Sequence, residues 1–309
     1  MGGIQQAEEY IKATINKIGA KVGPVLEPVW GMAREAARYR DLTIPTVTLY
    51  VQEDIGVGDF LKKELDPIDS LSGQITGVYV PPSVKVGATV NVILYMHGDK
   101  VRIWNKTGTI RDYWSLPELP LRQGLSKSGQ PFILVAPTLG QTAGAEFGNL
   151  GTNIDDHLDH VLAQLHKLGP PQFAPPKPPD IDQLIIAGHS GAFGPITSIL
   201  SSIKKYKSKI KEIWGFDIMY RGTAGFFETV SVPVYAYFND TEKHSRELAT
   251  KRKPNIFVME GVEFFRVRGR EESRMVKHDN LMQKFWLDRC RRIGTNGTDP
   301  DDKKRMVHR

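Results

Sequence analysis

Apolar residues along this chain fall into short continuous runs that alternate, in the second half, with runs of helical spacing. The continuous runs predict about eight strands, and several are apolar throughout, as is typical of buried parallel strands. We expect these strands at residues 46–51, 75–80, 90–96, 132–136, 184–187, 212–217, 232–238 and 262–267.

Four segments with helical periodicity separate the later strands. They cover residues 155–168, 193–207, 242–251 and 279–291. Alternation of strands and helices predicts an α/β fold, with a mostly parallel twisted sheet that carries helices on both faces. In such sheets the active site lies beyond the carboxyl ends of the strands, so the residues that follow each strand matter most.

The two ends of the chain differ from this central part. An N-terminal stripe with spacings of 3, 4, 4, 3 and 4 predicts one helix face, and residues 29–39 predict a second helix. We expect residues 1–41 to form a helical extension that packs on a main domain at 42–293, with a homodimer contact or a cover over the active site as alternatives. Residues 294–309 are polar and are expected to be a disordered tail. The stripe consists of Ile4, Ala7, Ile11, Ile15, Ile18 and Val22.

Composition narrows the class of protein. Of 309 residues, 40% are hydrophobic and 25% charged, which is typical of a globular chain. No apolar run is long enough for a transmembrane helix. The single cysteine, Cys290, excludes an intramolecular disulfide and a cysteine-based zinc site. Without a visible secretory signal, we expect a cytoplasmic protein.

The net charge of +6 is concentrated near the C-terminus. Residues 251–309 hold 16 Lys and Arg against 9 Asp and Glu, so the rest of the chain is close to neutral. No aromatic-basic motif or helix-turn-helix pattern accompanies this charge. We therefore expect a solvated basic surface and no nucleic-acid partner.

One motif carries the chemistry. An apolar run at 184–187 leads into Gly188-His189-Ser190-Gly191-Ala192, and a helical segment follows. This is G-x-S-x-A in a strand-turn-helix setting, a variant of the nucleophile elbow. The turn is so tight that residues two positions from the serine must be nearly free of side chain. The alternative is a glycine-rich turn in which Ser190 only caps the helix.

A second strand, at 90–96, ends in His97-Gly98. With the elbow and the run at 133–140 between them, the chain resembles the α/β-hydrolase superfamily over residues 42–293. The resemblance implies that Ser190 is a nucleophile and that the backbone N–H groups of Asp99 and Gly191 form an oxyanion hole. Asp99 departs from the apolar or small residue usual there. The resemblance implies a structural role for His97, and no cofactor.

A serine nucleophile needs a base and an acid. The histidines after Ser190 are His244, His278 and His308, and the resemblance favours His278, between the last strand and the final helix. The alternative is that His278 is a surface residue.

For the acid, the resemblance points to Asp240 after the seventh strand, with Glu242 a weaker option, or to Asp217 at the end of the sixth. We slightly prefer Asp217, because a carboxylate that interrupts an apolar strand needs a polar partner.

Residues 155–160 resemble a metal-binding cluster, with Asp156 and His160 on one helix face. Acidic residues are also what the first turn of a helix prefers, so we expect a helix start and no metal.

The substrate site has no diagnostic motif. The connection between the sixth and seventh expected strands is too short for a large helical cap. Gly98, His189, Trp104 and Phe193 are candidate pocket residues, and the aromatic ones are equally compatible with core packing. We expect a serine hydrolase of carboxylic esters or lactones, such as an acyl ester, an acyl-homoserine lactone or a polyester. An amidase or peptidase and a non-catalytic binding module are the alternatives.

Overall fold

The computed structural model describes residues 47–52, 75–85, 87–98, 110, 119–139, 153–168, 173, 176–220, 222–239, 242–251, 253–260 and 274–295. The expected N-terminal helices, the expected strand at 262–267 and the polar tail from residue 296 lie outside these ranges. The domain boundaries at 41 and 293 therefore stay predictions. Within the described ranges, every helix is too short or too polar to span a bilayer.

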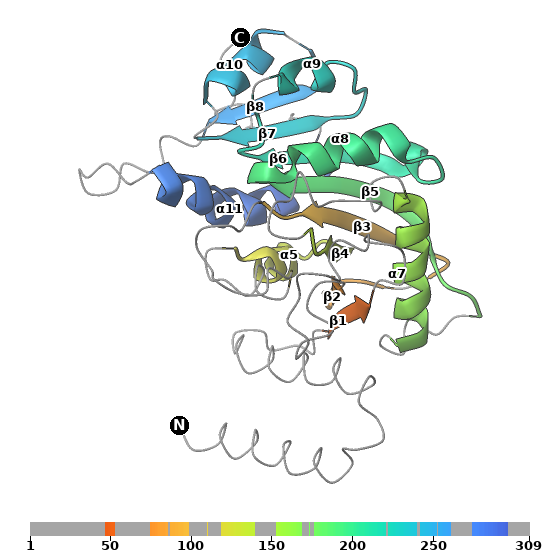
Figure 1. The fold of residues 1–309 in the computed structure, drawn as a ribbon. Coiled ribbons are helices and arrows are strands. Elements are labelled where there is room, and N and C mark those ends of the chain that lie inside the picture. The colour runs from red at the N-terminus through yellow and green to blue at the C-terminus, as the bar shows by residue number, and fades with distance from the viewer. Residues whose placement is uncertain are drawn as a thin grey trace, which may run out of the picture.

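The strands of the described ranges form one eight-stranded sheet at the centre of the fold, in the order β1-β2-β4-β3-β5-β6-β7-β8 (Figure 1). β2 runs antiparallel to both of its neighbours, and all other pairs from β4 to β8 are parallel. The predicted α/β class with a mostly parallel sheet is confirmed. The strands are β1 Val47–Gln52, β2 Ile75–Val80, β3 Thr89–Met96, β4 Phe132–Pro137, β5 Asp180–His189, β6 Ile210–Phe216, β7 Val234–Phe238 and β8 Ile256–Glu260.

One of the two strands that pair with β7 was not among the expected strands. The eighth strand is Ile256–Glu260, where Ile256 is the register partner of Val234 on β7. Two apolar runs follow one another in this part of the chain. Periodicity alone does not say which of them pairs with β7.

Helices cover both faces of the sheet, as predicted. Side chains of α7, α8, α9 and α10 contribute to the core on one face, and those of α5 and α11 to the core on the other (Figure 1). The pattern did not predict α5, which is short and polar, or the five-residue α9. The helices are α5 Leu121–Ser128, α7 Ile154–Leu168, α8 Phe193–Ser202, α9 Thr223–Phe227, α10 Glu242–Thr250 and α11 Arg274–Arg291.

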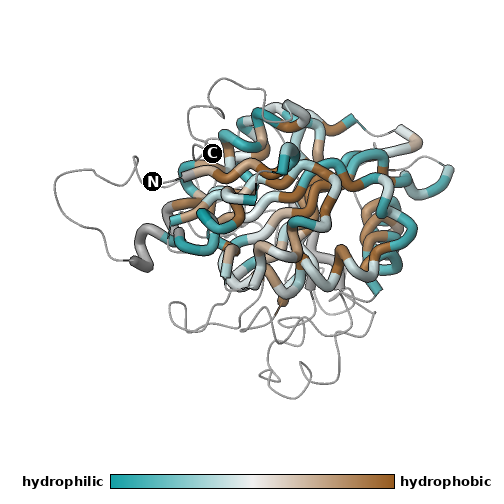
Figure 2. Tube along the Cα trace, turned by 90° about the horizontal axis from the view of Figure 1, so that it is seen from above, coloured by the Kyte–Doolittle hydropathy of each residue, from teal (hydrophilic) through white to brown (hydrophobic). Residues whose placement is uncertain are grey.

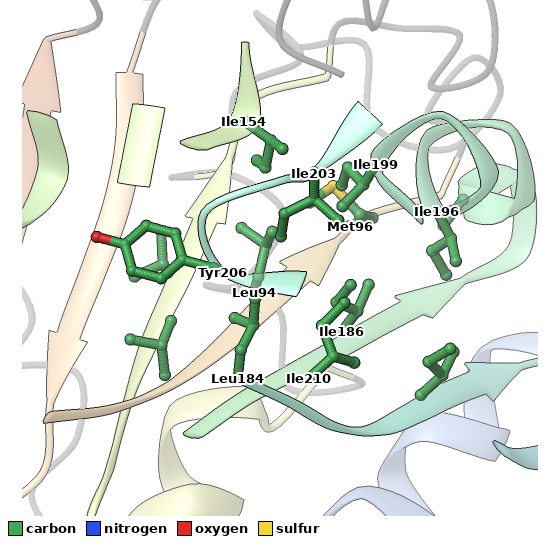
Figure 3. Close-up of a cluster of buried hydrophobic side chains, with 14 of the residues drawn as sticks. Leu94, Met96, Ile154, Leu184, Ile186, Ile196, Ile199, Ile203, Tyr206 and Ile210 are labelled. Carbon is green, nitrogen blue, oxygen red and sulfur yellow. The ribbon is translucent and has the colours of Figure 1, made fainter. Parts of the chain in front are cut away.

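Alternation along the strands builds the two cores. On β3, Leu94 and Met96 face the first core, whereas Ile93 and Tyr95 face the second. In the first core, the β3 side chains meet Leu184 and Ile186 from β5 and isoleucines from α8 (Figure 3). The strands run as apolar stretches through the interior, and polar residues gather on the outer helices (Figure 2). This packing fixes the β5 strand and the helix that follows it.

The second core is aromatic where α11 crosses the sheet. The ring of Trp286 on α11 lies 5.6 Å from that of Trp214 on β6, and Phe285 stacks on Tyr237 of β7 at 4.9 Å. The indole of Trp286 also donates a 2.7 Å hydrogen bond to the carbonyl of Leu121 on α5. These contacts hold α11 against β6 and β7, which matters because α11 carries His278.

Candidate active site

The strand β5 ends in a sharp turn that presents Ser190. Ser190 has a φ of 54°, an unfavourable value for a residue with a side chain, and a short 3-10 turn at Ser190–Ala192 continues directly into α8. A Cβ atom on Gly188 would lie 2.6 Å from the Cβ of Ala192. This is the steric requirement expected of the motif.

The turn also places Ser190 and Gly191 at the start of a helical segment. The first N–H groups of a helix have no acceptor within the helix and carry partial positive charge. Gly191 is the second residue of the 3-10 turn, and the Ser190 side chain is partly exposed. An anion that forms on an atom bound to Ser190 would therefore develop next to N–H donors.

The end of β3 approaches the same point. Met96 of β3 is the register partner of Gly188 on β5, and a Cβ atom on Gly98 would lie 2.6 Å from the Ser190 Cβ and 3.2 Å from its Oγ. Only glycine fits this approach without a shift of the backbone. Asp99, the other predicted oxyanion donor, lies outside the described residues.

His97 connects this loop to its neighbour. Its Nε2 accepts a 2.8 Å hydrogen bond from the N–H of Leu139, which follows β4, so the proton is on Nδ1, 2.7 Å from the carbonyl oxygen of Gly98. Both ring nitrogens are occupied by backbone groups. These bonds fit the structural role expected for His97.

Asp217 and His278 lie together beside the turn. Asp217 directly follows β6, and its Oδ2 is 2.6 Å from the Nδ1 of His278. The Asp217 side chain is fully buried and that of His278 nearly so. The two residues thus meet although they are separated by 61 positions in sequence.

The backbone around Asp217 is also held. Asp217 has a φ of 55°, its N–H donates to the carbonyl of Tyr237 at 2.7 Å, and its Oδ1 accepts from the N–H of Asn239 at 3.1 Å. The carboxylate therefore has a hydrogen-bond partner on each oxygen, which compensates for its burial. The polar partner expected for a carboxylate at this position is present.

These elements occur in one chain order: a serine on a strand-turn-helix elbow, then an aspartate after a later strand, then a histidine. Their sheet is mostly parallel and covered on both faces. The fold is that of the α/β-hydrolases.

No protein-family profile matches this sequence, and no curated protein matches it. Among solved structures, the chain is similar to an S-formylglutathione hydrolase from Agrobacterium tumefaciens. The two share 13% sequence identity with a TM-score of 0.45, over 81% of this chain and 96% of that one.

In this α/β-hydrolase fold, His278 lies within α11 rather than in a loop before it, because the helix begins at Arg274 and not near residue 279 as expected. His189 reaches it from the elbow. The Nε2 of His189 is 3.2 Å from the carbonyl oxygen of His278, and the two rings lie 4.6 Å apart. No sequence pattern predicts this contact, because 89 positions separate the two residues.

Of the remaining predicted residues, the structure describes some and not others. Phe193 is partly buried and packs against Phe226 and Phe227 of α9. His244 lies on α10 with its Nδ1 3.7 Å from Glu247. The carboxylate of Asp240, the side chain of Glu242, Trp104 and His308 all lie outside the described residues.

The acidic segment at 155–160 has structural contacts. Asp155 accepts hydrogen bonds from the backbone N–H groups of Lys204 and Lys205, and Asp159 pairs with the Lys205 ammonium at 2.6 Å and accepts a bond from the Tyr206 hydroxyl. These contacts join α7 to the segment after α8. In the described ranges, no group of three or more potential metal ligands converges.

Proposed function

We propose that this protein is a serine hydrolase that cleaves carboxylic esters or lactones through a covalent acyl-enzyme. The observation that carries the proposal is the buried 2.6 Å contact between His278 and Asp217 beside the strained turn that presents Ser190. A buried imidazole with a carboxylate on Nδ1 is oriented to act as a base through Nε2. Neither the strain at Ser190 nor a buried carboxylate stabilises the fold by itself.

In the first half of the reaction, Nε2 of His278 takes the proton of the Ser190 hydroxyl while Oγ attacks the carbonyl carbon. The His278 imidazolium is stabilised by the Asp217 carboxylate, which keeps the proton on Nδ1. The tetrahedral intermediate then collapses, the bond to the alcohol oxygen breaks, and His278 gives its proton to the departing oxygen. An acyl group remains on Ser190.

In the second half, water takes the place of the alcohol. His278 removes a proton from the water, the hydroxide attacks the acyl carbon, and the proton returns to Ser190 as the acid leaves. With a lactone, the alcohol and acid belong to one molecule, and a hydroxy acid is released.

The negative oxygen of each tetrahedral intermediate needs hydrogen-bond donors. The N–H of Gly191, at the start of the helical segment, is one such donor in this proposal, and the N–H of Asp99 is the other. Removing one donor of this kind from a serine hydrolase typically costs about 3 kcal/mol of transition-state stabilisation. The close approach of Gly98 to Ser190 supports the choice of the next residue in the sequence, Asp99, as this second donor.

The structure says less about the substrate than about the proposed catalytic residues. The connection between β6 and β7 is short and contains only the five-residue α9 among its described helices, so a large cap does not cover the site from this side. Phe193, the first residue of α8, lies three positions after Ser190 with the aromatic rings of α9 beside it. An apolar acyl chain or alcohol would suit these rings.

A fluorophosphonate probe tests the proposal directly, because it reacts with activated serines. Wild-type protein should be labelled at Ser190, mapped by mass spectrometry of the modified peptide, and Ser190→Ala should not be labelled. Ser198, which lies on α8 and is partly exposed like Ser190, provides the matched control Ser198→Ala, and labelling should persist in it. A panel of activated esters, lactones and amides then separates ester from amide chemistry. Folded wild-type protein that is neither labelled nor active on any of them would contradict the proposal and favour a non-catalytic binding module.

A further inference from the structure

His189, the residue directly before the proposed nucleophile Ser190, makes two contacts with His278. Its Nε2 lies 3.2 Å from the backbone carbonyl oxygen of His278. Its ring lies 4.6 Å from the His278 ring, with an angle of 32° between the planes. Only 3% of the His189 surface is exposed. The residue is therefore enclosed between the elbow and α11.

The first contact fixes where the proton of His189 is. A carbonyl oxygen accepts hydrogen bonds and cannot donate them, so Nε2 carries the hydrogen and donates it. Burial, and to a smaller extent the nearby His278, lower the pKa of His189 to about 3, against the opposing influence of the Asp217 carboxylate and of the hydrogen bond to the His278 carbonyl. His189 is thus a neutral donor near neutral pH. It adds no charge beside His278 when His278 becomes an imidazolium.

The second contact, between the two rings, limits a rotation of the His278 ring that the hydrogen bond to Asp217 still allows. One hydrogen bond at Nδ1 holds one edge of the His278 ring but still allows the ring to rotate about that bond. A ring packed against its face opposes this rotation, and the bond to the carbonyl holds the backbone of α11 at the same place. His189 is the residue directly before Ser190, whose φ is fixed by the turn. These contacts therefore also fix the position of His278 relative to the proposed nucleophile.

We infer that His189 is a positioning residue, which directs the Nε2 of His278 toward Ser190 by a hydrogen bond and a ring contact. The inference rests on the proposed function. It assigns the second position of the G-x-S-x-A motif a role in the orientation of the base, in place of the substrate-pocket role expected from the sequence. Positioning acts on the reaction step more than on substrate binding, so its loss should lower kcat and leave KM nearly unchanged.

Three variants separate the two contacts. His189→Phe keeps a ring and loses the donor, His189→Gln keeps a donor and loses the ring, and His189→Ala loses both. A misplacement of about 1 Å can cost about 100-fold in rate. We expect kcat on an activated ester, and the rate of fluorophosphonate reaction at Ser190, to fall about 100-fold in His189→Ala and by less in the other two.

His157 provides the matched control. It is a fully buried histidine on α7, burial also lowers its pKa to about 3, and its Nε2 is near Thr76 on β2 rather than near the elbow. His157→Phe should lower the free energy of unfolding but leave kcat and the labelling rate at wild-type values. A loss of kcat in His157→Phe as large as that in His189→Phe would overturn the inference.

The outcomes for the two proposals are distinct. Wild-type protein that is not labelled at Ser190 contradicts the proposed function itself. Labelled wild-type protein whose His189 variants react at the wild-type rate contradicts only the positioning role. A measurement without variants completes the test: ¹⁵N NMR of wild-type protein should show His189 neutral and protonated at Nε2 near neutral pH. A proton on Nδ1 alone, or on both nitrogens, would overturn the inference even if every variant failed to fold.

Discussion

The Asp217 carboxylate and the His278 imidazole meet at 2.6 Å between the end of β6 and the second turn of α11. Both side chains are buried, and the second carboxylate oxygen is held by the N–H of Asn239. The pair is therefore held by three parts of the structure: the end of β6, the helix α11 and the residue after β7. Under the proposed mechanism, this bond keeps the His278 proton on Nδ1, so that Nε2 can accept the proton of Ser190.

Asp217→Asn should leave the fold intact and lower kcat by about four orders of magnitude. An amide in this position can donate a hydrogen bond to Nδ1 and so stabilise the wrong tautomer of His278. Steady-state turnover of an activated ester measures the effect. Asp182→Asn, an exposed position on the same sheet, should retain wild-type kcat. Wild-type kcat in Asp217→Asn together with a large loss in Asp240→Asn would assign the acid to Asp240 instead.

Gly98 offers a second prediction, from its approach to the nucleophile. A Cβ atom at this position would lie 2.6 Å from that of Ser190, closer than such atoms approach in proteins. Gly98→Ala must displace either the end of β3 or the elbow, and we expect about a 100-fold loss of kcat. Gly87→Ala is the control, because a Cβ there meets nothing within 4 Å. Equal rates for the two variants would show that the loop after β3 does not border the reacting serine.

The sequence pattern predicts those parts of the site whose geometry depends on a single continuous segment of the chain. The elbow combines an apolar strand, two small residues and a helix, all within residues 184–202, so its geometry follows from adjacent residues. The preference for Asp217 over Asp240 followed from a carboxylate placed within an apolar run, and the structure does place Asp217 next to His278. The role of either residue as the acid stays a prediction until turnover is measured.

What the sequence did not predict depends on contacts between distant segments. The start of α11 at Arg274 and the pairing of Ile256–Glu260 with β7 depend on packing against the sheet. The contact between His189 and His278 has no local sequence pattern, because the pattern around Ser190 is the same whether the preceding histidine faces substrate or protein. In each case, packing between distant segments decides a feature that the local helix and strand propensities do not determine.

A third prediction concerns a buried ion pair at the other end of β6. Glu212 accepts hydrogen bonds from the Trp214 indole at 2.7 Å and from the N–H of Gly294 at 2.6 Å, and lies 3.8 Å from the Arg289 guanidinium. Arg289 is itself fully buried on α11, 3.7 Å from the centre of the Tyr235 ring. The pair joins α11 to β6, so the same strand and helix carry Asp217 and His278 at their opposite ends.

Removing one member of this pair leaves the other charge buried. Glu212→Ala should therefore lower the free energy of unfolding by about 3 to 5 kcal/mol, measured by urea denaturation. Glu228→Ala removes a partly exposed pair with Lys251 at 3.2 Å and should cost less than about 1 kcal/mol. If the two variants lose similar stability, the Glu212 carboxylate is solvated in solution and does not hold α11.

The last prediction concerns the response to acid. His157 is fully buried on α7, and burial lowers its pKa to about 3, with a smaller contribution from His160. An unfolded histidine has a pKa near 6.5, so between these values the unfolded chain binds the extra proton and the folded one does not. Stability is therefore complete above about pH 6.5 and falls as the pH decreases, by about 2 kcal/mol at about pH 5 for one such group.

His189 has a lowered pKa of about 3 from the same cause, so the wild-type protein should lose stability through both histidines. His157→Gln keeps a hydrogen-bonding side chain near Thr76 but cannot be protonated. Its free energy of unfolding should be lower than wild type at about pH 8, yet decrease about 2 kcal/mol less between about pH 8 and about pH 5. Urea denaturation at the two pH values measures both quantities. The same pH dependence in wild type and variant would mean that His157 accepts a proton in the folded state, and that α7 is open to water at this position.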